Sequence, residues 1–263
     1  MIYWLNGKLV PAEAAVLSPT DRGFTLGDGL FETLRVVDGA VLRVEAHLAR
    51  LAAGAQVLAL PLAGLNLAAA LTAVVAANHV ETGVVRLTVS RGSGPRGVLP
   101  PVEPHPTVLI GATALVAPAS APVRLMTCTV TRRNEMSPLS RIKSLNYLDN
   151  ILARQEAAAR GLDDALLLNT RGQVAEASYA NLFAVREGTL VTPPVADGAL
   201  PGIMRAEILR LGAREETLTP RDLAGAEEVF LSTSLGLRPV AELDGRVFAG
   251  GHSSYAALMQ ALG

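Results

Sequence analysis

The sequence predicts a two-domain α/β protein (an α+β arrangement with mixed sheets). Three observations predict this class: turn dipeptides between β-prone runs, apolar residues at helical spacing in several segments, and one uncharged linker-like segment. That segment, residues 117–122, reads APASAP and has the composition of an interdomain linker. We therefore expect an N-terminal α/β domain over residues 1–116 and a C-terminal α/β domain over residues 123–263.

The first domain is expected to begin with two hairpins. Asn6-Gly7 lies between short β-prone runs, and Asp38-Gly39 separates residues 30–37 from residues 40–43. Apolar spacing then predicts helices over residues 44–58 and 65–78, and strands over 84–90 and 107–116. Residues 51–80 carry no Asp, Glu, Lys or Arg, but Pro61 and Gly64 interrupt them. We interpret this run as two packed helices rather than a membrane span.

The second domain is expected to be richer in strands. A helix should follow Lys143, with Gly161 as its C-terminal stop, and another should begin at Pro201 and run to about residue 211. The apolar face of the first of these helices is predicted to comprise Leu145, Leu148, Ile151 and Leu152. Strands are predicted over residues 123–132, 165–169, 173–177, 181–185, 190–192, 228–232 and 238–243, with a last helix from residue 253.

Bulk properties exclude several classes of function. The net charge of −1 leaves no electrostatic footprint for nucleic acid or an anionic membrane. Cys128 is the only cysteine, which rules out an internal disulfide and fits a reducing compartment. The first residues lack the features of a signal peptide, so we expect a soluble, cytoplasmic protein. The four histidines have no ligand spacing, and no metal site is expected.

Lys143 is the first candidate for chemistry. The chain has 23 lysine and arginine residues in total, and only Lys8 and Lys143 are lysines. A lysine forms Schiff bases, and desolvation makes its free amine nucleophilic. A surface lysine at the start of a helix is the simpler interpretation of this position taken alone.

Several arginines and one acid are further candidates. Residues 92–97 match the glycine pattern of a dinucleotide-binding loop, but the prolines that follow prevent the helix which that motif requires, so we interpret this segment as a loop carrying Arg91 and Arg96. Arg50 lies on an apolar helix and is either a solvated surface residue or a phosphate ligand. Glu176 is either an edge-strand residue in water or a buried acid paired with a cation.

A reactive lysine, a phosphate-binding arginine and a buried acid are the groups that pyridoxal phosphate requires. Their segments resemble, in order and over nearly the whole chain, those of the class IV (fold type IV) pyridoxal-phosphate enzymes. This family contains branched-chain aminotransferases, D-amino acid aminotransferases and 4-amino-4-deoxychorismate lyases. The matching segments are GDGLFETLR (27–35), HLARL (47–51), IKSLNYL (142–148), EASYANLF (176–183), LPGIMR (200–205) and STS (232–234) followed by Pro239-Val240.

The resemblance implies a two-domain fold like that of D-amino acid aminotransferases, pyridoxal 5'-phosphate as cofactor, a small amino substrate and a homodimer. It implies catalytic roles for Lys143 and Thr33. The implied cofactor contacts are Arg50, Lys143, Tyr147, Glu176, Ser178, Ile203, Met204, Thr233 and Ser234. The implied substrate contacts are Phe31, Arg91 and Arg96.

The choice of reaction rests on fewer residues. Where D-amino acid aminotransferases trap the substrate carboxylate with a tyrosine, an arginine and a histidine, this chain has Phe31, Arg96 and Val98. The first signature and the glycine-rich loop are most similar to those of 4-amino-4-deoxychorismate lyases, so we expect release of pyruvate and 4-aminobenzoate, a step of folate synthesis. A class IV aminotransferase for branched-chain or D-amino acids is the alternative, and a non-catalytic cofactor-binding protein is a third hypothesis.

Overall fold

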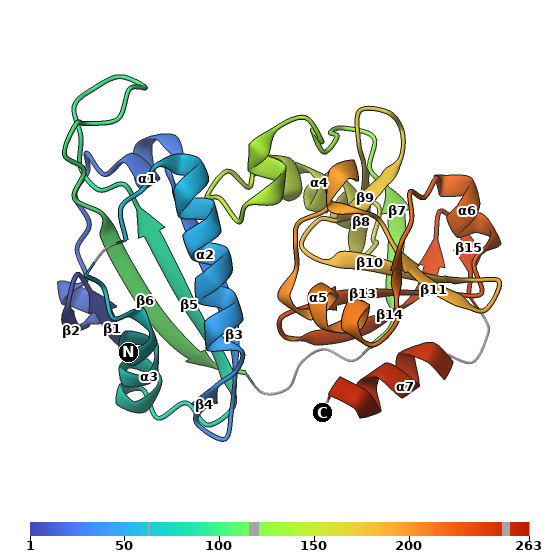
Figure 1. Ribbon diagram of the computed structural model, residues 1–263, viewed down its shortest axis with the longest axis horizontal. Helices are drawn as coiled ribbons and strands as arrows, with labels where there is room; N and C mark the ends of the chain where they lie inside the picture. The colour runs from blue at the N-terminus through green and yellow to red at the C-terminus, as the bar shows by residue number, and fades with distance from the viewer. Residues whose placement is uncertain (63, 116–120, 249–252, 263) are drawn as a thin grey trace. The chain divides into compact units, whose positions relative to one another are not determined.

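A computed structural model describes residues 1–62, 64–115, 121–248 and 253–262, and the chain divides into two compact units (Figure 1). Unit 1 comprises Met1–Pro118 together with Ile142–Asn146, and unit 2 comprises Ala119–Arg141 together with Tyr147–Gly263. Most of the predicted linker, residues 117–120, lies outside the described residues. The mixed α/β class expected from the sequence is confirmed.

Unit 1 contains a six-stranded sheet in which every described strand pair is antiparallel. Its order is β2-β1-β6-β5-β3-β4. Leu5 pairs with Lys8 across the Asn6-Gly7 turn, which confirms the first predicted hairpin. The second hairpin is also confirmed, because Val37 pairs with Ala40. The strands are β1 (Ile2–Leu5), β2 (Lys8–Pro11), β3 (Gly29–Val37), β4 (Ala40–Val41), β5 (Gly83–Ser90) and β6 (Thr107–Ala114).

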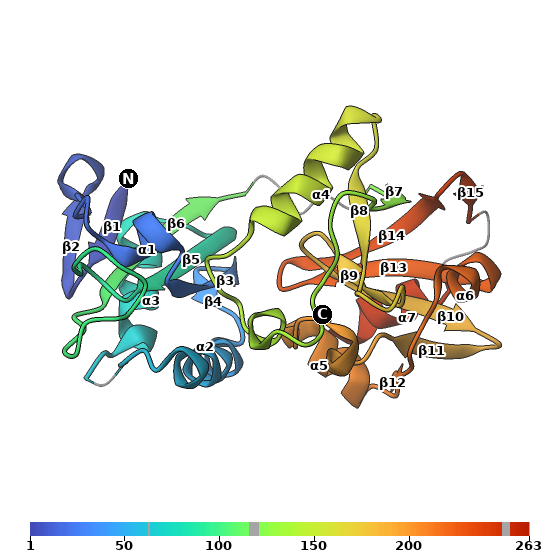
Figure 2. The same cartoon turned by 90° about the horizontal axis from the view of Figure 1, so that it is seen from above.

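Two helices and one face of this sheet form the core of unit 1. These are α2 (Val44–Leu58) and α3 (Leu67–Ala77); the shorter α1 (Arg22–Leu26) and the 3-10 turn η1 (Ala12–Ala14) precede β3. Figure 2 shows α2 running along one side of the sheet. Since side chains alternate along a strand, Leu30, Leu34 and Val36 of β3 face the helices, whereas Phe31 and Thr33 face the opposite side.

The lysine segment belongs to unit 1 by main-chain pairing. The amide of Phe31 donates to the carbonyl of Lys143 at 2.9 Å, and the amide of Leu145 donates to the carbonyl of Gly29 at 2.9 Å. A side chain at position 29 is excluded, because its Cβ would lie 2.4 Å from the carbonyl oxygen of Val89. Residues 143–145 thus extend the edge of β3 and hold Lys143 beside it.

Unit 2 contains a nine-stranded mixed sheet, so the expectation of a more strand-rich second half is confirmed. Its order is β12-β11-β10-β13-β14-β7-β8-β9, with β15 paired to β14, and parallel pairs join β7 to β14, β7 to β8 and β11 to β12. The strands are β7 (Val123–Thr127), β8 (Asp164–Leu168), β9 (Val174–Ala177), β10 (Asn181–Arg186), β11 (Thr189–Thr192), β12 (Arg214–Glu215), β13 (Glu228–Thr233), β14 (Gly236–Leu243) and β15 (Arg246–Val247).

The helices of unit 2 surround this sheet. They are α4 (Leu148–Ala159), α5 (Ile203–Arg210), α6 (Pro220–Gly225) and α7 (Ser253–Leu262), with 3-10 turns η2 (Pro138–Arg141) and η3 (Val195–Asp197). Beneath α5, Phe183 and Phe230 stack at 5.3 Å and pack with Met204 and Ile208. This packing holds α5 against β10 and β13.

The predicted apolar face of α4 is wrong. Leu148, Ile151 and Leu152 are 74%, 48% and 48% exposed, and the helix instead buries Asn150, Ala153 and Ala157. Small side chains let α4 lie close to β8, whereas the larger leucines point outward. The helix also begins at Leu148, later than expected, because the residues after Lys143 pair with β3.

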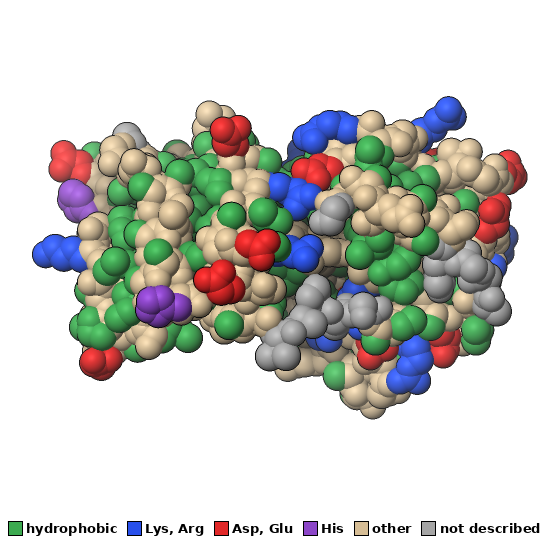
Figure 3. Space-filling view, turned by 90° about the horizontal axis from the view of Figure 1, so that it is seen from below, with side chains coloured by type: hydrophobic (Ala, Val, Ile, Leu, Met, Phe, Trp, Pro, Cys, Tyr) green, Lys and Arg blue, Asp and Glu red, His purple; other side chains and the backbone are tan. Residues whose placement is uncertain are grey.

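Two further expectations concern the surface and the charge-free run. The run without charged residues, 51–80, is divided between α2 and α3. No helix within the described residues is long and apolar enough to cross a membrane. On the face drawn in Figure 3, acidic and basic side chains are interspersed among apolar ones. This face therefore carries no extended field of one sign.

Candidate active site

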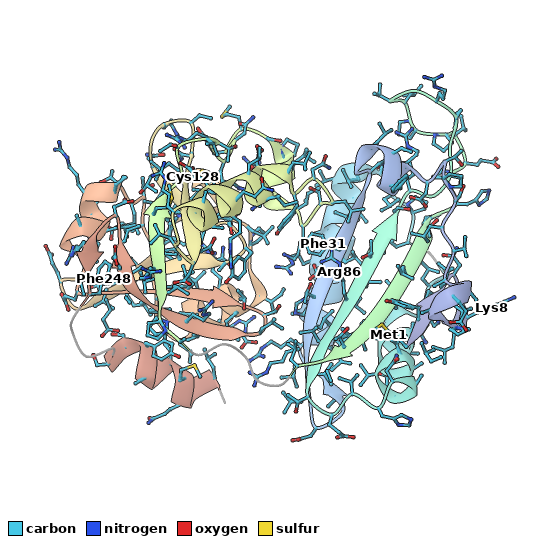
Figure 4. All side chains as sticks on the ribbon, turned by 180° about the vertical axis from the view of Figure 1, so that it is seen from behind. Met1, Lys8, Phe31, Arg86, Cys128 and Phe248 are labelled. Atoms are coloured by element: carbon cyan, nitrogen blue, oxygen red, sulfur yellow. The ribbon has the colours of Figure 1, made fainter. Side chains whose placement is uncertain are left out.

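Lys143 lies on the side of the unit 1 sheet that faces away from α2. Its Nζ atom is 4.5 Å from the centre of the Phe31 ring. The guanidinium carbon of Arg86 is 4.0 Å from the same centre. Figure 4 labels Phe31 and Arg86, which lie next to each other on this sheet. Arg86 of β5 pairs with Thr33 of β3, so the hydroxyl of Thr33 belongs to the same face. An amine, a guanidinium and a hydroxyl thus come together around one buried aromatic ring.

Arg50 is held by a buried carboxylate on the opposite face of β3. Its Nε and Nη2 atoms donate to Glu32 at 2.8 Å and 2.5 Å, and Nδ1 of His47 lies 2.7 Å from the same carboxylate. Burial raises the pKa of Glu32, but hydrogen bonds and charges from Arg50 and His47 outweigh this effect and leave the pKa below its ordinary value. An ionised Glu32 therefore orients the guanidinium of Arg50 from the core side.

The two loop arginines have different environments. Arg91 is buried, and it donates to Asp28 and to the carbonyls of Leu58 and Ala59 at 2.7 to 3.0 Å. Because these contacts connect three parts of unit 1, Arg91 stabilises this unit, and its predicted contact with the substrate stays a prediction. Arg96 is exposed on the loop, as a substrate-binding residue requires.

Glu176 is a buried acid, 5% exposed, and not a solvated edge residue. One of its carboxylate oxygens lies 3.2 Å from Nε of Arg133. The other accepts hydrogen bonds from the amide of Leu200 at 2.9 Å and from the side chain of Asn181 at 3.4 Å. These donors fix the carboxylate in one orientation.

The N-terminus of α5 offers an anion site in unit 2. Gly202 caps this helix without a side-chain hydrogen bond, and the amides of Ile203 and Met204 belong to its first turn. Nearby on β13, the buried hydroxyl of Ser232 has no hydrogen-bond partner among the described residues. A phosphate group at this helix end would provide the missing acceptors, so the residues present fit the phosphate of pyridoxal phosphate.

The remaining predicted cofactor residues also belong to unit 2. The Ser178 hydroxyl donates to Asp164. Burial raises the pKa of Asp164 above its ordinary value despite this bond. Tyr147 precedes the first turn of α4. The Thr233 hydroxyl accepts from the amide of Leu235 at 3.1 Å, so it supports the turn between β13 and β14. The cofactor contacts of these residues and of Ser234 stay predictions.

The predicted site residues fall into two sets, one in each unit. Phe31, Thr33, Arg50, Arg96 and Lys143 belong to unit 1. Tyr147, Glu176, Ser178, Ile203, Met204, Thr233 and Ser234 belong to unit 2. No role at the site was predicted from the sequence for three further side chains that lie there: Glu32, Arg86 and Arg133. Only Arg86 carried a usable signal, because it is the one charged residue in the strand over 83–90.

Known proteins of one family are similar to this chain over most of its length. The family model described as amino-transferase class IV matches residues 29–243, and enzymes of this family use pyridoxal phosphate. A D-alanine aminotransferase of Listeria monocytogenes is 34% identical, over 94% of this chain and 89% of its own length.

Two solved structures are similar over nearly their whole length. The branched-chain amino acid aminotransferase of Escherichia coli has a TM-score of 0.93 and 28% identity, covering 99% of this chain and 93% of that one. A 4-amino-4-deoxychorismate lyase from Pseudomonas aeruginosa has a TM-score of 0.86 and 37% identity, covering 98% of this chain and 97% of that one.

Proposed function

From the premise that this chain belongs to the class IV aminotransferase family, we propose that it is a 4-amino-4-deoxychorismate lyase. The products, pyruvate and 4-aminobenzoate, each keep one carboxylate, so the substrate is an amine with two carboxylates. The observation that carries the proposal is the cluster of Lys143, Arg86 and Thr33 around Phe31. The likeness to the Pseudomonas aeruginosa lyase supports the same choice.

In this proposal each carboxylate has its own arginine. Arg86, in contact with the Phe31 ring near Lys143, would bind one carboxylate, and Arg96 on the exposed loop would bind the other. Phe31 has no hydroxyl to donate to a carboxylate, and Val98 has no ring nitrogen, so the three-residue trap of D-amino acid aminotransferases is incomplete. The incomplete trap favours the lyase over that activity.

Pyridoxal phosphate, when bound, supplies an aldehyde that condenses with amines and a ring that accepts an electron pair. The phosphate would be held by Arg50, by the amides of Ile203 and Met204, and by hydroxyls at the end of β13. Glu176 would keep a proton on the ring nitrogen. Its own orientation comes from Arg133 and the Leu200 amide.

Lys143 would carry the proton transfers. Its amine removes the proton from the substrate carbon that bears nitrogen, and the bond between ring carbon and enolpyruvyl oxygen breaks. The six-membered ring becomes aromatic, and the proton ends on the methylene carbon of the departing enolpyruvate. Thr33, which pairs with Arg86 across β3 and β5, would assist this transfer. The atoms of substrate and products balance, so no oxidant or water is consumed.

Release of pyruvate and 4-aminobenzoate from the amine substrate, with no oxo acid added, tests the proposal. We expect equal amounts of the two products, and loss of both in Lys143→Ala. Arg86→Gln should raise KM, because a neutral amide cannot pair with a carboxylate. Wild-type protein that holds the cofactor but releases neither product would contradict the lyase.

An aminotransferase for branched-chain or D-amino acids is the second candidate. The observation that favours it is the likeness to the Listeria and Escherichia coli aminotransferases over nearly the whole chain. Conversion of amino donors to oxo acids, followed with a panel of L- and D-amino acids, would identify it. A non-catalytic cofactor-binding protein is the outcome in which Lys143 binds cofactor and neither reaction occurs.

We also propose that the chain works as a homodimer. Leu148, Ile151 and Leu152 expose one apolar stripe of α4, and Phe24 of α1 is 80% exposed. A partner subunit would remove such side chains from water. Light scattering that reports a monomer at micromolar concentration would contradict this. The cytoplasmic location stays a prediction.

A further inference from the structure

The loop that carries Arg96 is held by a buried arginine that belongs to none of the predicted site residues. Arg22, the first residue of α1, is 3% exposed. Its Nη1 and Nη2 atoms donate to the carbonyls of Gly97 and Val98 at 2.9 Å and 2.8 Å. A longer contact of 3.4 Å joins Nη1 to the carbonyl of Leu99. One guanidinium therefore binds three consecutive carbonyls directly after Arg96.

The same arginine is itself fixed in place. Nε of Arg22 donates to Asp28 at 2.8 Å, and Arg91 donates to the same carboxylate oxygen at 2.7 Å. The stem of Arg22 passes Gly94 closely, since a Cβ at that glycine would lie 3.0 Å from Cδ of Arg22. Asp28 thus aligns the fork of Arg22 toward the loop, and the second arginine keeps Asp28 from turning away.

Main-chain contacts with the same segment hold the first half of the loop. The amide of Arg22 donates to the carbonyl of Gly92 at 2.9 Å, and the amide of Gly94 donates to the carbonyl of Thr20 at 3.3 Å. The second half has no comparable apolar anchor, because Val98 and Leu99 are 85% and 82% exposed. The side chain of Arg22 is therefore the principal restraint on the residues that follow Arg96.

We propose that Arg22 is a positioning residue for substrate recognition, which sets the place of Arg96 by holding the carbonyls of residues 97–99. This inference rests on the proposed role of Arg96 in binding a substrate carboxylate. A guanidinium on a loose loop loses conformational freedom each time it binds, and this loss weakens binding. A loop held in advance avoids the loss, so the effect of Arg22 should be on KM and should depend on Arg96.

The kinetic test compares Arg22→Lys with Arg91→Lys. The two arginines are matched in burial and in their Asp28 partner, but Arg91 holds the end of α2 instead of residues 97–99. Lysine keeps the charge beside Asp28 and lacks the fork for three carbonyls. We expect Arg22→Lys to raise KM about tenfold with kcat within about twofold. In the Arg22→Lys background, adding Arg96→Ala should change KM by less than about threefold. In the Arg91→Lys background, Arg96→Ala should change KM as much as it does in the wild-type protein.

A second measurement needs no turnover. Trypsin cleaves after arginine, so the bond between Arg96 and Gly97 reports on the restraint of the loop itself. We expect cleavage at this bond, mapped by mass spectrometry, to be about tenfold faster in Arg22→Lys than in wild type and unchanged in Arg91→Lys. Equal cleavage in Arg22→Lys and wild type would overturn the inference, as would additive KM effects. Faster cleavage in protein that turns over no substrate would support the restraint and contradict the proposed function instead.

Discussion

Glu32→Gln isolates the buried carboxylate that orients Arg50. The wild-type carboxylate is fully buried, and it pairs with two nitrogens of Arg50 and with His47 at 2.5 to 2.8 Å. Glutamine keeps the shape but brings an NH2 group against donors and removes the negative charge. Because breaking a buried ion pair leaves a charge without its partner, we expect a loss of about 3–5 kcal/mol in the free energy of unfolding.

Two assays separate stability from cofactor binding. Urea denaturation at neutral pH measures the first, and dialysis against cofactor-free buffer measures how fast pyridoxal phosphate is released. We expect faster release in Glu32→Gln, because Arg50 loses the contact that orients it. Glu13→Gln removes the same formal charge from an exposed side chain and should change stability by less than about 0.5 kcal/mol.

The pH dependence gives an independent check on Glu32. Its pKa in the folded protein lies below the ordinary 4.5, so its stabilisation is complete above that pH and is lost as pH falls through the folded pKa. Glutamine does not titrate. The stability difference between wild type and Glu32→Gln should therefore shrink in acid. The reasoning is refuted if the two glutamine variants unfold and release cofactor alike at neutral pH.

Three further predictions concern unit 2. Arg133→Met removes a guanidinium that lies 3.2 Å from the buried Glu176; we expect about 3 kcal/mol lower stability in urea and a slower turnover. Gly202→Ala places a Cβ 2.0 Å from the side-chain oxygen of Asn181; we expect a shifted α5 N-terminus, weaker cofactor binding in a titration, and a loss of about 1–3 kcal/mol. Burial raises the pKa of Glu156, but hydrogen bonds from Thr129 outweigh this effect and lower the pKa to about 2. The stability that Glu156 contributes is therefore complete above pH 4.5 and is lost as the pH falls through about 2. The free energies of unfolding of wild type and Glu156→Gln should therefore converge as the pH falls from 4.5 to about 2.

Local signals in the sequence predicted most elements well. Asn6-Gly7 and Asp38-Gly39 supply the positive φ angles that tight hairpins require, and both turns form as expected. The predicted helix over residues 44–58 coincides with α2, whose period depends only on neighbours within a few positions. In each case the physical cause lies within a dozen residues, so the sequence alone carries it.

The errors arise where the cause is distant in sequence. The leucines of α4 have helical spacing, and that spacing says which residues share a face but not what covers it. In the structure Ala153 and Ala157 face β8, because close packing there leaves no room for larger side chains. The ion pair of Glu32 and Arg50 could not be predicted for the same reason, since no local pattern relates a strand residue to a helix residue 18 positions later.

The segment around Lys143 shows why the domain division and the site are connected. The composition of residues 117–122 predicted a domain boundary there. Residues 142–146 nevertheless belong to unit 1, because Lys143 and Leu145 pair with β3. The lysine is thereby anchored to the strand that carries Phe31 and Thr33, and β3 is anchored to the strand that carries Arg86. The amine, the hydroxyl and one guanidinium keep their mutual distances through the main chain of a single sheet. Substitutions in unit 2 should therefore change cofactor binding without moving Lys143 relative to Arg86.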